Sequence, residues 1–347
     1  MIDYVIMMVI LIFLVFEILY NSKFVSVNEH FFDRTNTNSM RGFWCLVVIL
    51  VHVPTLYQNR IQDMIGSFAY IGVTFFFMTS SYGLTLSQAN NPNGIHYFWR
   101  KRLPKLLFTS WIISILFSII DYYFNGTIQL KKVFGINEWV KWLLACYLLF
   151  WISNMVFRNQ IYSKIGICIM ITVGSLLVYF MQRGGFFTRA TWTTECYGFV
   201  WGILLASFGK EFISFFKEKW LFKWCVLGTI ATILGCLYLK YKIIPFAGDY
   251  LLKIILGIAI TCFILCANTR IELGNSVNMF LGKISFEIYL IHGDVFRLMG
   301  KIREWNHSGL YILCCIFLTV FLASAVHIVS DSAVKVLNKM PIMQNDG

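Results

Sequence analysis

The chain has 347 residues, of which 58% are hydrophobic and only 13% are charged. Soluble domains are usually about 45–50% apolar and about 25% charged, so this composition excludes a large soluble domain and indicates a protein embedded in lipid. The formal net charge is +12, but the basic residues are spread over short connections between hydrophobic runs. We therefore expect membrane lipid headgroups and an anionic ligand as partners, and no nucleic acid.

Eleven apolar runs approach the roughly 20 residues that a helix needs to cross a bilayer. The first run lacks the basic start and the small-residue cleavage site of a signal peptide, so we expect a retained helix. We see no internal repeat. The expected fold is all-α, a polytopic transmembrane helical bundle of about eleven spans. The runs are 2–20, 40–57, 68–86, 106–124, 139–157, 165–181, 193–208, 221–239, 250–267, 277–298 and 310–328.

Lys and Arg residues in short loops indicate the side of the membrane on which each loop lies. The densest cluster contains Arg100, Lys101, Arg102 and Lys105, between the third and fourth runs. We place this loop in the cytoplasm, which puts the N-terminus outside. All ten cysteines lie in apolar runs without a CxxC pair, so we expect neither a disulfide framework nor a metal site.

Two ionisable residues stand out on the second run, Arg41 and His52. Eleven helical steps turn about 1100°, so the two lie within about 20° of one another and about 16 Å apart along the axis. Cys45 and Val48 lie on the stripe between them. An ionisable group within a span is a functional candidate. Taken singly, Arg41 could be an interfacial arginine and His52 could form an interhelical hydrogen bond.

Three further stretches follow in order: 72–82 reads GVTFFFMTSSY, 98–104 reads FWRKRLP and 281–292 reads LGKISFEIYLIH. Together with Arg41-Gly42 and His52, they resemble the acyltransferase 3 family. The family patterns are Gly-Val-x-x-Phe-Phe-x-x-Ser-Gly-Tyr, an Arg-x-Arg loop and Gly-x-x-Ser-x-x-x-Tyr-Leu-x-His. Two positions differ, because Ser81 replaces a glycine and Asn38 replaces an acidic residue. Each motif is weak alone, but four in the family's order are strong.

The resemblance implies a ten-helix membrane core with an extra helix. We expect residues 1–39 to form this N-terminal transmembrane helix and a cytoplasmic loop, and residues 40–340 to form the acyltransferase membrane domain. It further implies an O-acyltransferase in the bacterial plasma membrane. The donor would be cytoplasmic acyl-CoA, with acetyl-CoA favoured, and the acceptor would be a hydroxyl of a surface carbohydrate or glycolipid.

The resemblance also implies that Arg100 and Arg102 hold the phosphates of acyl-CoA. Arginine suits this task because its planar fork makes bidentate, charge-assisted hydrogen bonds, and Lys101 adds a further charge. The alternative interpretation of this basic cluster is that it only anchors the loop on the cytoplasmic side of the membrane and so fixes the topology of the chain. His52 could act as a general base on the sugar hydroxyl or as an acyl relay, and the sequence leaves both open. Arg41 could polarise the carbonyl or grip the pantetheine.

Four other residues are weaker candidates. Ser80 and Tyr289 lie within the motifs. His292 also lies within a motif, and we expect it to position another site residue and not to act on the substrate itself. Glu195 could orient His52 or bind a sugar hydroxyl, although we favour a solvated interfacial carboxylate.

Lys283 and Glu287 are four residues apart on one run, so we predict that they form an ion pair.

A transporter or flippase for a small polar solute or a lipid-linked sugar is the alternative function. Many spans with charged residues inside the membrane would suit it. Such proteins often have short or Gly/Pro-broken helices in corresponding halves of the chain. This chain has only five prolines and no repeat, which favours the acyltransferase.

Overall fold

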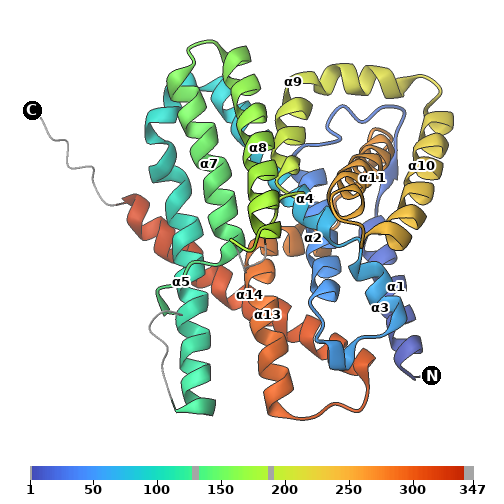
Figure 1. Cartoon of the computed structure of the whole chain (residues 1–347), viewed down its shortest axis with the longest axis vertical. Coiled ribbons are helices and arrows are strands. Elements are labelled where there is room, and N and C mark those ends of the chain that lie inside the picture. Colours follow the sequence, from blue (N-terminus) through green and yellow to red (C-terminus); the bar gives the residue numbers. More distant parts are fainter. Residues whose placement is uncertain (1, 127–132, 187–190, 340–347) are drawn as a thin grey trace, which may run out of the picture.

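The computed structural model describes residues 2–126, 133–186 and 191–339. Within these ranges the chain is a helical bundle (Figure 1). The helices are α1 (Ile2–Leu19), α2 (Arg34–Val51), α3 (Arg60–Gly66), α4 (Tyr70–Asn90), α5 (Phe98–Asn125), α7 (Glu138–Val156), α8 (Gln160–Arg183), α9 (Tyr197–Lys217), α10 (Trp220–Tyr241), α11 (Lys253–Asn268), α12 (Ser276–Lys283), α13 (Ser285–Ile302) and α14 (Ser308–Lys339).

Three short helices and one pair of two-residue strands complete the described structure. They are the 3-10 helices η1 (Thr55–Tyr57) and η2 (Pro92–Tyr97), the π-helix η3 (Ala247–Leu252), and the antiparallel strands β1 (Lys23–Phe24) and β2 (Ile271–Glu272).

Nine helical stretches in the described ranges are long and apolar enough to cross a membrane. The prediction of an all-α polytopic bundle is therefore confirmed. Each of the eleven predicted runs falls on helix, but two of them do not form a full apolar span. Run 40–57 loses its α-helix after Val51, and run 277–298 is divided between α12 and α13 at Ile284. Both elements are largely buried in protein, so they need not be as apolar as a helix that faces lipid.

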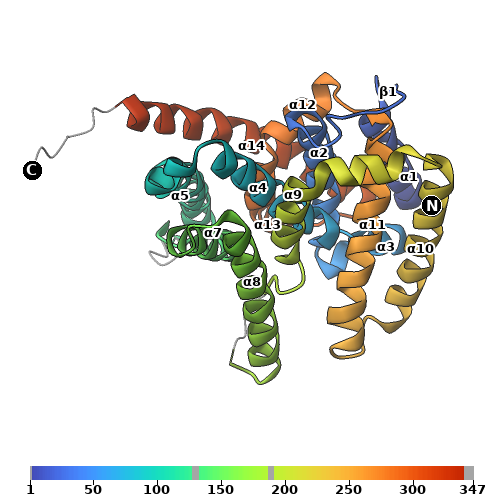
Figure 2. The same ribbon diagram turned by 90° about the horizontal axis from the view of Figure 1, so that it is seen from above.

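Figure 2 shows α2, α4 and α13 in the middle of the bundle, while α12 packs on α2 at its edge. α2 lies against α1, α4, α12 and α13. The outer helix α10 buries only Gly235 and Tyr238, and its remaining apolar side chains suit contact with lipid. α9 bends at Phe208, whose backbone leaves helical geometry, and its second half runs across the end of the bundle in Figure 1.

Polar side chains fix the segments that lead into α2 and α12. β1 pairs with β2, and the Asn28 amide donates to the carbonyl oxygen of Asn268 at 3.0 Å. Asp33 then caps α2 by accepting a hydrogen bond from the Asn36 N–H at 2.8 Å. These contacts place the segment that leads into α2 beside the segment that leads into α12.

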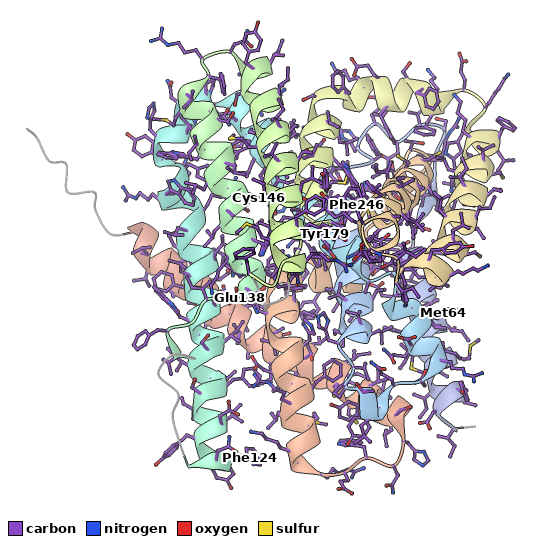
Figure 3. All side chains as sticks on the ribbon, in the orientation of Figure 1. Met64, Phe124, Glu138, Cys146, Tyr179 and Phe246 are labelled. Atoms are coloured by element: carbon purple, nitrogen blue, oxygen red, sulfur yellow. The ribbon has the colours of Figure 1, made fainter. Side chains whose placement is uncertain are left out.

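A second polar cluster fixes the turn between α10 and α11. Tyr179 of α8 donates to Asp249 at 2.8 Å, and Arg183 forms an ion pair with the same carboxylate. Tyr179 also packs beside Phe246, with ring centroids 5.8 Å apart, as Figure 3 shows. The turn that precedes Lys253 is therefore held in one position.

Candidate functional site

A cavity of about 860 Å³ lies at the end of the bundle where α2 begins. It is lined by segments that are distant in sequence, since side chains from α2, α4, α5, α7, α13 and α14 contribute. Its polar lining includes Arg41, Ser80, Lys101, Arg102, Lys105, Tyr147, Glu287, Tyr289, His327 and Asp331. We call it the basic cavity.

Arg41 reaches the basic cavity from the first half of α2. Its guanidinium lies over the ring of Phe76, 5.9 Å from the centroid. The Arg41 Nε atom is buried and has no hydrogen-bond partner within the described residues. Because an unpaired buried donor is costly, this guanidinium is well suited to a ligand that supplies an acceptor oxygen. The hydroxyls of Ser80 and Tyr147 line the same cavity and interact with one another.

The basic cluster occupies the first turn of α5, not a loop, because α5 already begins at Phe98. Arg100, Lys101 and Arg102 are all exposed. Lys101 and Arg102 line the basic cavity, whereas Arg100 is not among its described lining residues. The 3-10 helix η2 runs directly into α5, and the Phe98 N–H already donates to the carbonyl oxygen of Ile95, so the positive charge of this turn comes from its side chains.

Lys105, one turn further along α5, was not predicted as part of the site. Its ammonium lies 2.9 Å from Glu287 and 2.5 Å from Asp331. His327 approaches Glu287 at 2.9 Å. The predicted ion pair between Lys283 and Glu287 is wrong, because the chain breaks between α12 and α13 and Glu287 instead faces α5 and α14.

A second cavity, of about 350 Å³, lies at the opposite end of α2 and α4. We call it the histidine cavity. Its polar lining includes His52, Gln62, Asp63, Ser67, Tyr70, Trp192, Glu195, Tyr238, Lys242, Lys253 and Tyr289.

His52 is the residue that follows the last turn of α2, and its side chain is exposed. Its ring Nδ1 lies 3.1 Å from the carbonyl oxygen of Val48. With Nδ1–H donating to that carbonyl, the other ring nitrogen is free to accept a proton. The helix ends here because Pro54 follows and disfavours helical geometry in the residue before it.

Glu195 lies in the histidine cavity, and the expectation of a solvated carboxylate is wrong. The side chain is buried and pairs with the Lys253 ammonium at 2.6 Å. The Thr194 hydroxyl donates to its second oxygen at 2.9 Å. Lys253 was not predicted, although a lysine near the start of the apolar run 250–267 is itself a signal of a buried partner.

His292 and Tyr289 come from α13. His292 is buried and lies against His52, with ring centroids 4.5 Å apart. Tyr289 packs on Trp139 at 4.7 Å and borders both cavities. The structure thus brings His52, Glu195, His292 and Tyr289 together at one end of α2, and Arg41, Ser80, Lys101 and Arg102 at the other.

The family model described as an acyltransferase domain matches residues 34–328. The chain belongs to the acyltransferase 3 family. No curated protein and no solved structure gives a match. The protein is therefore a membrane acyltransferase, and helix α1 lies before the matched region.

The acyltransferase 3 motifs have clear structural roles in this chain. Gly42 and Gly282, from two motifs, lie where α2 crosses α12. A Cβ atom on Gly282 would lie 2.0 Å from the carbonyl oxygen of Asn38, and one on Gly42 would lie 2.8 Å from that of Asn278. Glycine allows this approach, which places Arg41 beside the start of α13.

Ser81, which replaces the family glycine, is accommodated by α9. A Cβ atom on Gly202 would lie 2.0 Å from the Ser81 hydroxyl. The space that a glycine would provide on α4 is thus provided by the neighbouring helix of this acyltransferase.

Proposed function

We propose that this acyltransferase moves an acyl group from acyl-CoA in the basic cavity to a hydroxyl group in the histidine cavity. The observation that carries the proposal is the presence of two chemically different cavities at opposite ends of α2 and α4. One supplies cations for an anionic donor. The other supplies an imidazole that can handle the proton of an acceptor hydroxyl.

The donor binds with its phosphates at the first turn of α5. Lys101 and Arg102 line the basic cavity and contact the phosphates, while Arg100 adds positive charge from the same turn. The pantetheine arm is long and thin, and it extends into the cavity toward Ser80 and Arg41. We place this end of the bundle in the cytoplasm of a bacterial cell, at the plasma membrane, because its basic residues satisfy the positive-inside rule.

Arg41 grips the pantetheine arm inside the basic cavity. Its unpaired Nε–H donates a hydrogen bond to an amide carbonyl oxygen of the arm and directs the thioester toward the histidine cavity. The family resemblance favours acetyl as the acyl group.

His52 acts on the acceptor by one of two routes. As a general base it takes the hydroxyl proton while the oxygen attacks the thioester carbonyl, and CoA leaves as the thiolate, which is then protonated. As a relay it first attacks the carbonyl itself, CoA leaves, and the hydroxyl then takes the acyl group from the imidazole. Glu195, Lys253 and Trp192 line the same cavity and offer partners for a carbohydrate or glycolipid acceptor.

The test is turnover and binding of labelled acetyl-CoA by the purified full-length protein. His52→Ala should lower acyl transfer by about 10²–10⁴-fold and leave CoA affinity unchanged. Arg102→Ala should weaken CoA binding by about 10-fold or more, because hydrogen bonds to charged groups contribute about 1.5–3 kcal/mol.

Arg100→Ala is the matched control, since it removes the same charge from the same turn without changing the cavity lining. It should weaken CoA binding less than Arg102→Ala does. Equal effects of the two substitutions would contradict a specific phosphate site in the cavity. Failure of the native protein to bind or consume acetyl-CoA or longer acyl-CoA donors would favour the transporter instead.

A further inference from the structure

One residue links the linings of the two cavities. Tyr289 borders both of them, and it is the one described residue that does so. Arg41 and His52 lie on one face of α2, yet they open into different cavities. Between them, Cys45 and Val48 are each only 1% exposed. The direct line from Arg41 to His52 along α2 is therefore filled by protein, and Tyr289 marks the place where the cavities come closest.

The surroundings of Tyr289 form an aromatic layer. Its ring centroid lies 4.7 Å from that of Trp139 and 6.0 Å from that of Phe76, and both of these residues line the basic cavity. On the other side its hydroxyl interacts with the side chain of Trp192, which lines the histidine cavity. His292 lies 5.6 Å from the same ring. Tyr289 therefore has neighbours from the linings of both cavities, and its ring lies between them.

We propose that Tyr289 is a movable partition between the donor and acceptor cavities, and that its ring must swing aside for the acyl group to reach His52. This inference rests on the proposed function. A tyrosine side chain has two rotatable bonds, so the ring can turn into the adjoining cavity space without a change in the backbone. In its closed position, Tyr289 keeps water and solutes of the histidine cavity away from the thioester.

The partition has two measurable consequences. Tyr289→Ala removes the ring and joins the two cavities, so water gains access to the bound thioester. We expect hydrolysis of acyl-CoA in the absence of acceptor to rise several-fold relative to transfer, and small ions to leak across proteoliposomes that contain the full-length protein. Tyr289→Phe keeps the ring and loses only the hydroxyl, so the membrane should remain tight to ions.

Tyr311→Ala is the control for damage to the bundle. Tyr311 is also buried, and its hydroxyl donates to the carbonyl oxygen of Phe296 at 2.8 Å. It lies outside the described linings of the two cavities, so its removal should leave both ion permeability and acceptor-free hydrolysis at the native level.

Ion leakage can be measured with a fluorescent dye inside the vesicles, without any acyl donor. Leakage in Tyr289→Ala alone, with a tight Tyr289→Phe variant, supports the partition. Equal leakage in Tyr289→Ala and Tyr311→Ala, or no leakage and no added hydrolysis in Tyr289→Ala, overturns it. If Tyr289→Ala leaks while the native protein turns over no acyl-CoA, the partition stands and the proposed function fails.

Discussion

Glu195 and Lys253 form an ion pair that is largely shielded from solvent, since their side chains retain 9% and 19% of their accessible area. Removal of one partner from a buried pair costs about 3–5 kcal/mol, because the other charge is left unpaired. Lys253→Met should therefore lower the thermal midpoint of unfolding markedly. Addition of Glu195→Gln to that variant should recover much of the loss, and a double variant no more stable than the single one would contradict the pairing.

An exposed pair provides the comparison. Lys141 and Glu138 lie 2.8 Å apart on α7, with side chains 45% and 36% exposed. Exposed pairs usually contribute about 0–1 kcal/mol. Lys141→Met should thus change the thermal midpoint only slightly in the same assay.

The sequence singled out Arg41, Arg102 and His52, and each of them lines one of the two cavities, although their roles stay predictions. Arg41 and His52 stand out because polar groups within apolar runs are costly and need a reason. Arg102 stands out because it belongs to a dense basic cluster that resembles a family motif. Lys105 and Lys253 were missed because their partners lie far away in the sequence. The pairing of Glu195 with Lys253, 58 residues further along, depends on helix packing that no local pattern indicates.

At the scale of elements, α4 and α9 approach one another closely because α9 carries Gly198 and Gly202 one turn apart. A Cβ atom on Gly202 would lie 2.2 Å from the carbonyl oxygen of Met78. Gly202→Ala should therefore destabilise the bundle by about 1–3 kcal/mol or more, the usual range for overpacking. Thermal unfolding in detergent measures this.

Two variants sharpen the test at α9. Ser81→Gly should not rescue Gly202→Ala, because the clash with the Met78 backbone remains after the hydroxyl is removed. Gly174→Ala on α8 is the matched control, since a Cβ atom there meets nothing within 4 Å. It should be neutral or slightly stabilising. A fully rescued double variant would show that the side chain of Ser81, not the backbone, limits the approach.

Two helix boundaries inside the predicted runs were missed. Run 40–57 was predicted to continue past Pro54, although this proline marks the end of α2, and the break between α12 and α13 has no proline. There the Ser285 hydroxyl donates to the carbonyl oxygen of Gly282 at 2.8 Å, a local hydrogen bond that competes with helix continuation. The helical start of α5 was missed because basic residues were interpreted only as a loop signal.

At the scale of the whole molecule, the net charge of +12 and the basic cavity should make donor binding depend on salt. The attraction between exposed cations and phosphates falls as the Debye length shortens, from about 10 Å at 0.1 M to about 3 Å at 1 M. We expect the dissociation constant for CoA to rise with KCl concentration. The rise should be shallower for Arg102→Ala, and a salt-independent constant for the native protein would contradict phosphate binding by this cluster.

The class of fold followed directly from composition, because only helices and closed barrels satisfy backbone hydrogen bonds in lipid. The two cavities could not be predicted in this way. They form where α2, α4, α5, α13 and α14 leave space between them, and the shape of that space depends on the close crossings at glycine. Sequence patterns indicate which residues are candidates, but tertiary packing decides which cavity each one faces.

If Tyr289 is the partition that we propose, an acyl group can cross the membrane without the passage of its carrier. The spent coenzyme is then released where it entered and can be recharged by the metabolism of that compartment. The acceptor likewise never has to enter the cell interior. Two pools of solutes would then exchange an acyl group while remaining unmixed, with cleavage of the thioester giving the process its direction.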